Sequence, residues 1–211
     1  MFQPLKKFLF VVGGYFIFVI LFILTAKFFQ NSGIFFTFDQ SILSFFVSIR
    51  REWLTGAMKV FTFVGGIEFI LPVSVALLVW FWLSKRIFYF LFLAFSVSVS
   101  AGLVFLLKDF FVRVRPAIES RLVSEDSFSF PSGHAMMAIA FWGALAYLLA
   151  ENFPKRWQKI IVAVGGAALI FIISASRLYL GVHWPTDILG SWILAGVWLA
   201  GLILLFKNKP E

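Results

Sequence analysis

Residues 87–107 read IFYFLFLAFSVSVSAGLVFLL, a run without any charged side chain that is followed directly by Lys108. A helix needs about 17–25 mainly apolar residues to cross the hydrocarbon core of a bilayer. This run therefore predicts a transmembrane helix. Five further apolar runs bring the predicted number to six: 8–28, 57–83, 134–150, 159–176 and 188–206.

The composition of the whole chain also fits a lipid environment. Of the 211 residues, 62% are hydrophobic and only 13% are charged, whereas soluble domains are near half apolar and about a quarter charged. We therefore expect an all-α, polytopic membrane protein whose six transmembrane helices form a bundle. Because the loops are too short to hold a second domain, residues 1–211 are expected to form a single membrane-embedded domain.

The lysine and arginine residues indicate how the chain lies in the membrane. Nine of them fall in short segments that would share one side with the N-terminus: 1–7, 84–86, 151–159 and 207–211. Seven fall in much longer segments on the other side: 28–56, 108–133 and 177–187. The difference in density predicts that both termini are cytoplasmic. The first apolar run lacks a small-residue cleavage site, so we expect an uncleaved anchor in the plasma membrane.

The net charge of +8 bears on the partners of the chain. The basic residues occur in short clusters between apolar runs, which favours membrane lipid headgroups over nucleic acid. An obligate protein partner is not indicated. Cysteine is absent from the sequence, which excludes disulfides, thiolate metal sites and a cysteine nucleophile.

Residues 39–53 show helical periodicity outside the predicted spans. Apolar side chains recur on one side and polar side chains on the other, which predicts an interfacial amphipathic helix in the headgroup layer. Two interpretations are open, a gate for lipid or a cover packed on the bundle. The apolar side consists of Ile42, Phe45, Phe46, Ile49 and Trp53.

Three polar segments lie at the ends of the predicted spans: Lys108–Pro116, Pro131–His134 and Ser176–Asp187. The first two share a loop and the third lies two crossings later, so all three lie on one face of the membrane. Both histidines of the chain, His134 and His183, belong to them. Singly, a cation at a helix end is usually a headgroup anchor. The joint occurrence of cations and histidines in these three segments favours a catalytic site.

The residue types in these segments suit phosphate chemistry. Lys108, Arg115 and Arg177 place three cations on the same face, and arginine can grip phosphate oxygens with two hydrogen bonds. In the second segment, Ser132 adds a hydroxyl donor. Gly133 lets the backbone N–H groups of a helix start approach an anion closely.

The two histidines can take different roles. His183 and Asp187 are four residues apart, and Pro185 suits a helix start between them. The carboxylate can bond one imidazole N–H, which fixes the tautomer and leaves the other nitrogen free to attack. His134 is then the natural proton donor to the leaving alcohol.

The three segments resemble the type 2 phosphatidic acid phosphatase superfamily, whose signature is Lys-x6-Arg-Pro, Pro-Ser-Gly-His and Ser-Arg-x5-His-x3-Asp. Every signature position is matched within residues 108–187. The resemblance implies that His183 is the nucleophile, Asp187 its partner and His134 the general acid. It also implies a set of residues that hold the phosphate: Lys108, Arg115, Ser132, Gly133 and Arg177.

In size and composition the chain is most similar to the bacterial phosphatidylglycerophosphate phosphatases of type B and their undecaprenyl diphosphate phosphatase relatives. The resemblance implies a lipid phosphate substrate, phosphatidylglycerophosphate together with phosphatidic acid or related lipid phosphates, with undecaprenyl diphosphate as the alternative. It also implies a phosphohistidine intermediate formed without metal or cofactor. A phospholipid transporter is the alternative of another class, but its charged residues would lie at mid-depth rather than at one end.

Several charged residues outside the signature leave alternatives open. Glu68 lies inside the second apolar run and is either functional or at a membrane edge. Arg113 and Arg121 flank the site loop and either steer anionic headgroups or anchor the surface. No two-metal site is expected, because the nearby acidic residues are scattered and predicted to face solvent: Asp109, Glu119, Glu125 and Asp126.

Overall fold

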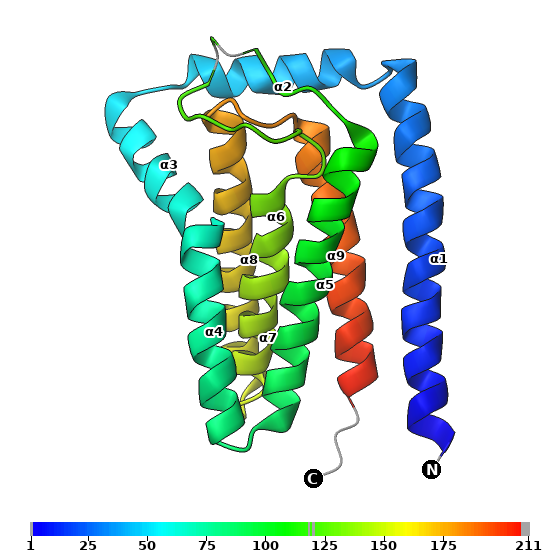
Figure 1. Ribbon diagram of the computed structural model, residues 1–211. Coiled ribbons are helices and arrows are strands. Elements are labelled where there is room, and N and C mark those ends of the chain that lie inside the picture. The colour runs from blue at the N-terminus through cyan, green and yellow to red at the C-terminus, as the bar shows by residue number, and fades with distance from the viewer. Residues whose placement is uncertain (1, 118, 120, 208–211) are drawn as a thin grey trace.

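The computed structural model describes residues 2–117, 119 and 121–207, and these residues form helices joined by loops (Figure 1). Six of its helical segments are long and apolar enough to cross a membrane, which confirms the predicted number. They are α1 (Phe2–Ser32), the stacked pair α3 (Glu52–Val64) and α4 (Ile67–Leu83), α5 (Ile87–Phe111), the continuous series α6 (Gly133–Met137), η2 (Ala138–Gly143) and α7 (Ala144–Ala150), α8 (Arg156–Tyr179) and α9 (Pro185–Phe206).

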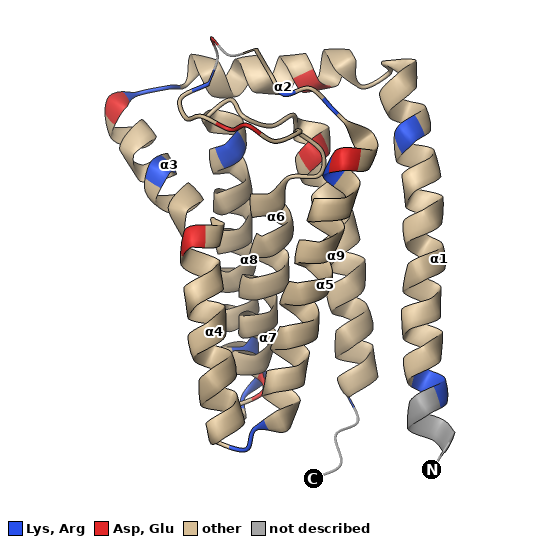
Figure 2. Ribbon diagram, viewed as in Figure 1, with Lys and Arg blue, Asp and Glu red and all other residues tan. Residues whose placement is uncertain are grey.

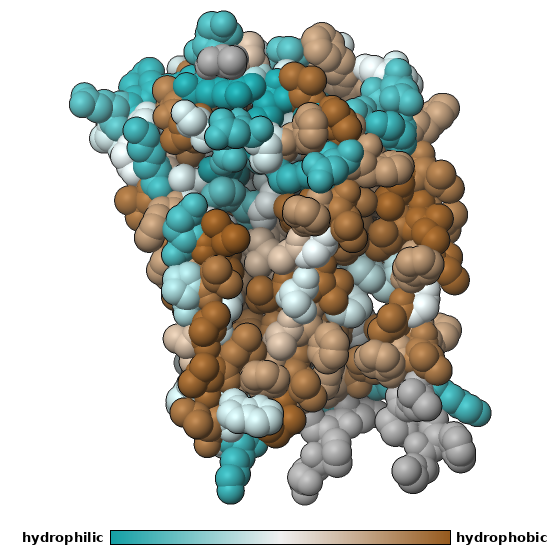
Figure 3. All heavy atoms as spheres, in the orientation of Figure 1, coloured by the Kyte–Doolittle hydropathy of each residue, from teal (hydrophilic) through white to brown (hydrophobic). Residues whose placement is uncertain are grey.

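The surface of the bundle is that of an integral membrane protein. Figure 3 shows a broad hydrophobic band around the middle, with hydrophilic residues gathered above and below it. Charged residues gather at the upper end and at the lower turns, while the middle of the bundle is nearly free of them (Figure 2). Lys209, one of the basic residues used to predict the orientation, lies outside the described residues.

The interior is held by aromatic and aliphatic side chains at the junctions between helices. Phe92 of α5, Phe141 of η2 and Leu194 and Trp198 of α9 belong to one buried cluster. Helix α1 packs mainly on α9, and the Tyr15 hydroxyl donates to the Leu194 carbonyl oxygen at 2.9 Å. This packing holds α1, α5, η2 and α9 against one another.

The second predicted span is longer than 57–83 and is not one helix. It begins at Glu52 and is interrupted at Gly65–Gly66, between α3 and α4. A Cβ on Gly65 would lie 2.3 Å from Cγ2 of Ile173, so the corner packs on α8 more closely than any larger residue allows. The interruption therefore follows from helix packing, which the hydropathy of the sequence does not report.

The predicted helix 39–53 is also wrong in its bounds. Helix α2 (Phe36–Ser48) lies across the upper end of the bundle and ends before Arg50. Arg51 is extended, and its N–H donates to the Tyr179 hydroxyl at 2.9 Å, so a tertiary contact with α8 turns the chain here. Trp53, predicted on the apolar side of this helix, is instead an exposed residue of α3.

Helix α2 covers part of the bundle. Its Leu43 is buried, while Ile42 and Phe46 pack against Leu178 and Ile188 at the ends of α8 and α9. Other apolar side chains of the helix remain exposed at the level of the membrane boundary: Phe36, Phe38 and Phe45. The contacts of helix α2 are therefore those of a cover packed on the bundle. A gating motion of this helix stays a prediction.

Candidate active site

The three polar segments meet at the upper end of the bundle, as the sequence predicted. Lys108 lies in the last turn of α5, His134 in the first turn of α6, and Arg177 in the last turn of α8. His183 lies in the short loop before α9, and Asp187 lies in the first turn of that helix. One site therefore receives side chains from four spanning segments and two loops.

The pair formed by His183 and Asp187 is the most buried part of the site. Nδ1 of His183 lies 3.3 Å from Oδ2 of Asp187, and the two residues are 1% and 0% exposed. Asp187 also accepts the Trp184 N–H at 2.8 Å, since Trp184 is the N-cap of α9 and Pro185 its first residue. The helix start thus holds the carboxylate against the imidazole, as predicted.

The other ring nitrogen of His183 faces the cations. Its Nε2 lies 3.1 Å from Nη1 of Arg115. Burial and the positive charge of Arg115 lower the pKa of His183 to about 4. The hydrogen bond to Asp187 raises this pKa but only partly opposes them. The imidazole is therefore neutral near pH 7, and with Nδ1–H turned to Asp187 it keeps a lone pair on Nε2.

Arg115 and Lys108 are fixed by the loop that precedes α6. Arg115 donates to the carbonyl oxygens of Ser127 and Val182, each at 2.6 Å. Lys108 donates to the Ser127 hydroxyl at 2.9 Å and to the Phe128 carbonyl oxygen at 2.5 Å. The same loop therefore fixes both side chains, and their positive charges interact with each other.

Glu125 corrects the prediction that the nearby acidic residues face solvent. Its carboxylate forms ion pairs with Arg177 and, at 3.3 Å, with Arg115. Its side chain is only 24% exposed. Burial would raise the pKa of Glu125, but the two guanidinium groups outweigh burial and hold it below the usual range. The carboxylate thus lies between two of the cations predicted to bind phosphate.

The Pro-Ser-Gly-His segment begins α6. Ser132 is fully buried and caps the helix, and its hydroxyl accepts the Ala135 N–H over a long 3.5 Å. The Ser132 N–H donates to the Ser191 hydroxyl of α9 at 2.8 Å. A Cβ on Gly133 would meet Val104 at an ordinary 3.6 Å. Space around Gly133 therefore does not by itself require glycine.

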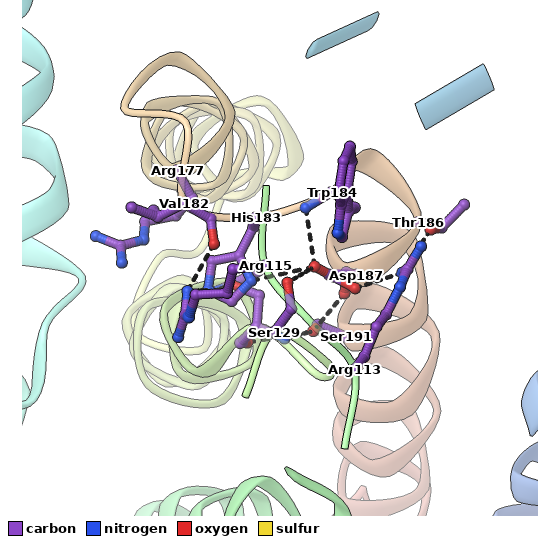
Figure 4. Close-up of polar contacts among 12 residues, drawn as sticks. Arg113, Arg115, Ser129, Arg177, Val182, His183, Trp184, Thr186, Asp187 and Ser191 are labelled. Atoms are coloured by element: carbon purple, nitrogen blue, oxygen red, sulfur yellow. Dashed lines mark hydrogen bonds and ion pairs between the residues drawn. The ribbon is translucent and has the colours of Figure 1, made fainter. Parts of the chain in front are cut away.

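Arg113, which the sequence left open as a residue that steers headgroups or anchors the surface, contacts the buried pair directly. Its Nη1 lies 2.5 Å from Oδ1 of Asp187, and its Nη2 lies 2.6 Å from Oδ2 of Asp39. Figure 4 shows Arg113 and His183 on opposite sides of Asp187. Side chains two residues apart share one side of an extended segment. The order Arg113-Val114-Arg115 could therefore have indicated that both arginines point inward.

Ser129 also bonds Asp187, whereas Arg121 bonds a carbonyl oxygen of the loop. The Ser129 hydroxyl donates to Oδ2 of Asp187 (Figure 4). Asp39, 1% exposed on α2, also accepts the Thr186 N–H at 2.9 Å. The Arg121 guanidinium instead donates to the Pro116 carbonyl oxygen, at 2.9 and 2.7 Å, which makes it a brace of the loop.

Comparison with known proteins agrees with this geometry. Residues 89–211 match the model of the PAP2 superfamily. The chain is 34% identical over 173 residues to phosphatidylglycerophosphatase B of Bacillus subtilis, which covers 81% of each chain. It is 38% identical over 81 residues to an undecaprenyl-diphosphatase of Sulfolobus acidocaldarius, which covers 38% of this chain and 34% of that protein.

The fold is also similar to a solved structure. The crystal structure of a transmembrane PAP2-type phosphatidylglycerolphosphate phosphatase from Bacillus subtilis superposes with a TM-score of 0.79 at 27% identity. The superposition covers 100% of this chain and 99% of that one. The overall fold is therefore shared with that protein.

Proposed function

The chain belongs to the PAP2 superfamily, and we propose from this that its site hydrolyses the terminal phosphate of phosphatidylglycerophosphate. It is an integral membrane lipid phosphatase, a phosphoric monoester hydrolase. The observation that carries the proposal is the buried His183–Asp187 pair, whose other ring nitrogen, Nε2, lies against the guanidinium of Arg115. The proposed domain is the whole chain, 1–211, with its motifs within 108–187.

In the proposed first step, Nε2 of His183 attacks phosphorus in line with the departing lipid alcohol. The N–P bond forms as the P–O bond to the alcohol breaks, and His134 gives its proton to the leaving oxygen. Asp187 stabilises the positive charge that develops on the imidazole. The products of this step are a free lipid alcohol and a phosphohistidine.

In the second step, His134 takes a proton from water, and the resulting hydroxide attacks phosphorus. The N–P bond breaks, inorganic phosphate leaves, and His183 returns to its neutral form. Lys108, Arg115 and Arg177, together with Ser132 and the backbone at Gly133, are the groups proposed to hold the equatorial oxygens. Phosphoryl transfer depends mainly on such positioning and charge stabilisation.

Glu125 has to leave the arginines before a phosphate can bind in the proposed way. Its carboxylate contacts Arg115 and Arg177, which are the groups that an incoming phosphate would contact. A phosphate dianion carries more negative charge than one carboxylate and offers three oxygens. Substrate can therefore replace the Glu125 carboxylate at these two arginines.

The orientation we propose places the site on the extracytoplasmic face of the cell membrane. Basic residues such as Lys85, Arg86, Lys155 and Arg156 lie in the turns at the lower end of the bundle, opposite the site (Figure 2). The positive-inside rule assigns that end, where α1 begins and α9 ends, to the cytoplasm. A lipid phosphate of the outer leaflet would then have its headgroup at the level of His183.

Undecaprenyl diphosphate and phosphatidic acid are the alternative substrates. All three lipids present a terminal phosphate to the cations, and the difference lies in the leaving group. This group is an alcohol in phosphatidylglycerophosphate and phosphatidic acid, and a lipid monophosphate in undecaprenyl diphosphate. The more extensive similarity to a phosphatidylglycerophosphatase supports the first choice. Phospholipid transport is less well supported, because the charged residues gather at the two ends of the bundle rather than at mid-depth (Figure 2).

Phosphate release from purified lipid phosphates in detergent tests the proposal. Wild-type protein and His183→Ala would be compared on phosphatidylglycerophosphate, phosphatidic acid and undecaprenyl diphosphate. The expected result is the highest kcat/KM for phosphatidylglycerophosphate and no turnover by the variant. A preference for undecaprenyl diphosphate would replace the proposed substrate, and wild-type inactivity on every lipid would contradict the function.

A further inference from the structure

Glu68 is an ionisable residue of a spanning segment that the mechanism above does not use. It lies in the first turn of α4, inside the span Glu52–Leu83, and its side chain is exposed. Among the described residues its carboxylate forms no hydrogen bond or ion pair. An unpaired carboxylate inside a spanning segment costs free energy, so its presence indicates a functional role.

The corner between α3 and α4 directs Glu68 toward the site. Gly66 is the N-cap of α4, and a Cβ placed on it would lie 2.6 Å from Oε2 of Glu68 and 3.4 Å from Nε2 of His134. The carboxylate and the imidazole therefore face each other across Gly66. Only the absence of a side chain at this position leaves that space open.

The position of this corner is set by contacts with α8. Gly65 packs on Ile173, and Thr62, one turn earlier on α3, accepts a hydrogen bond from Arg177. Glu68 also interacts electrostatically with Arg177. Its carboxylate thus borders the space that holds the phosphate, on the side of His134 and of the lipid.

The proposed mechanism defines what occupies this space. In an in-line displacement, the leaving alcohol departs opposite Nε2 of His183 and next to His134, which protonates it. A substituent on the second carbon from the ester oxygen would then lie close to Glu68. A carboxylate accepts hydrogen bonds and cannot donate them, so it suits a hydroxyl group and not an ester oxygen or a hydrocarbon.

We propose that Glu68 is a specificity-determining residue that accepts a hydrogen bond from a hydroxyl on the leaving alcohol. The favoured substrates are lipid phosphates whose phosphorylated alcohol carries a free hydroxyl beside the ester, as a glycerol headgroup does. An acylated glycerol or an isoprenoid monophosphate, as leaving group, lacks this free hydroxyl. The inference rests on the proposed function, because it needs the leaving alcohol beside His134.

A matched pair of lipids tests the inference. One is phosphatidylglycerophosphate, and the other has a propane-1,3-diol phosphate headgroup that differs only by the missing hydroxyl. Wild-type protein should favour the first in kcat/KM by about 10- to 100-fold, the range for a hydrogen bond to a charged group. Glu68→Leu should bring this ratio close to one by lowering kcat/KM for the hydroxyl-bearing lipid alone.

The controls separate this role from others. Turnover of the diol lipid by Glu68→Leu shows that the variant is folded. The matched control is Glu52→Gln, which removes an exposed carboxylate of the same span that faces no site residue. It should keep the wild-type ratio. Equal losses on both lipids, or an unchanged ratio in Glu68→Leu, would overturn the inference. Wild-type inactivity on both lipids would instead contradict the proposed function.

Discussion

Arg113 holds the carboxylate of Asp187 from the side opposite His183, with Nη1 2.5 Å from Oδ1. The same guanidinium lies 2.6 Å from Asp39 of α2, so the helix that covers the bundle is connected to the buried pair. Asp187 can hold the imidazole in one orientation only if its own position is fixed. The connection thus makes Arg113 a positioning residue for the proposed nucleophile.

Arg113→Gln should lower kcat by about 10- to 100-fold, since a hydrogen bond to a charged group contributes about 1.5–3 kcal/mol. KM should change little, because Arg113 does not face the phosphate space. Arg113→Lys should recover part of the loss, and Asp39→Asn should cost less than Arg113→Gln. Steady-state kinetics of these variants in detergent measure the effect.

Arg121→Gln is the matched control, because Arg121 donates to the Pro116 carbonyl oxygen rather than to Asp187. Its kcat should remain close to that of the wild type. If Arg113→Gln keeps full kcat, or if only KM changes, the positioning role is wrong.

The acid limb of the pH profile should lie near the pKa of His183, about 4, and not near 6.5. Burial depresses this pKa, so the imidazole is neutral above about pH 4 and becomes protonated as the pH falls through that value. Protonation of Nε2 removes the attacking lone pair. After correction for the second ionisation of the substrate phosphate, near pH ~6, the logarithm of kcat/KM should therefore fall only below about pH 4.

Recovery of activity after return to neutral pH controls for irreversible unfolding in this experiment. An acid limb with a midpoint near 6.5 would show that His183 is protonated more easily than its burial predicts.

The spans and the three polar segments could be predicted because both signals are local. Uncharged runs such as 87–107 report burial in lipid, and the four-residue spacing of His183 and Asp187 reports a contact within one turn. The contact between Asp39 and Arg113 joins residues 74 positions apart and depends on how α2 lies on the bundle. The periodicity of the sequence does not indicate a contact between residues so far apart.

The position of Glu125 and the interruption of the second span have the same explanation. Glu125 faces inward because Arg115 and Arg177, which come from different segments, converge on it. The chain turns at Gly65 because Ile173 of α8 lies against it. Both features result from packing between distant segments, so a sequence alone indicates only which residues are available for them.

Activity is expected to survive an excess of chelator, because Lys108, Arg115 and Arg177 supply the positive charge for the phosphate oxygens. Vanadate should inhibit by adopting the trigonal-bipyramidal geometry of the transition state. Phosphate release with and without chelator tests this in one preparation. A loss of turnover in chelator that magnesium restores would contradict the proposed mechanism.

The proposed orientation can be tested with single cysteines, since the chain has none of its own. Ser124→Cys and Lys155→Cys place a thiol at exposed positions at opposite ends of the bundle. A membrane-impermeant maleimide applied to intact cells should label the first and not the second, and should label both after lysis. The opposite pattern would place the site in the cytoplasm.

The roles of the two histidines can be separated with an activated phosphate ester whose phenolate leaves without a proton. His183→Ala should show no turnover on any substrate, because no N–P bond can form. His134→Ala should still form the phosphohistidine from the activated ester. Hydrolysis of this intermediate should remain slow, because His134 is also the proposed base for water.

The phosphoenzyme should therefore accumulate on the His134→Ala protein after brief exposure to the activated ester. Phosphate bound to an imidazole nitrogen is labile in acid and stable in base, unlike a phosphate ester of serine. The labelled peptide should contain His183, and the double variant with His183→Ala should carry no label. Label on another residue, or turnover by His183→Ala alone, would refute the assignment of His183 as the nucleophile.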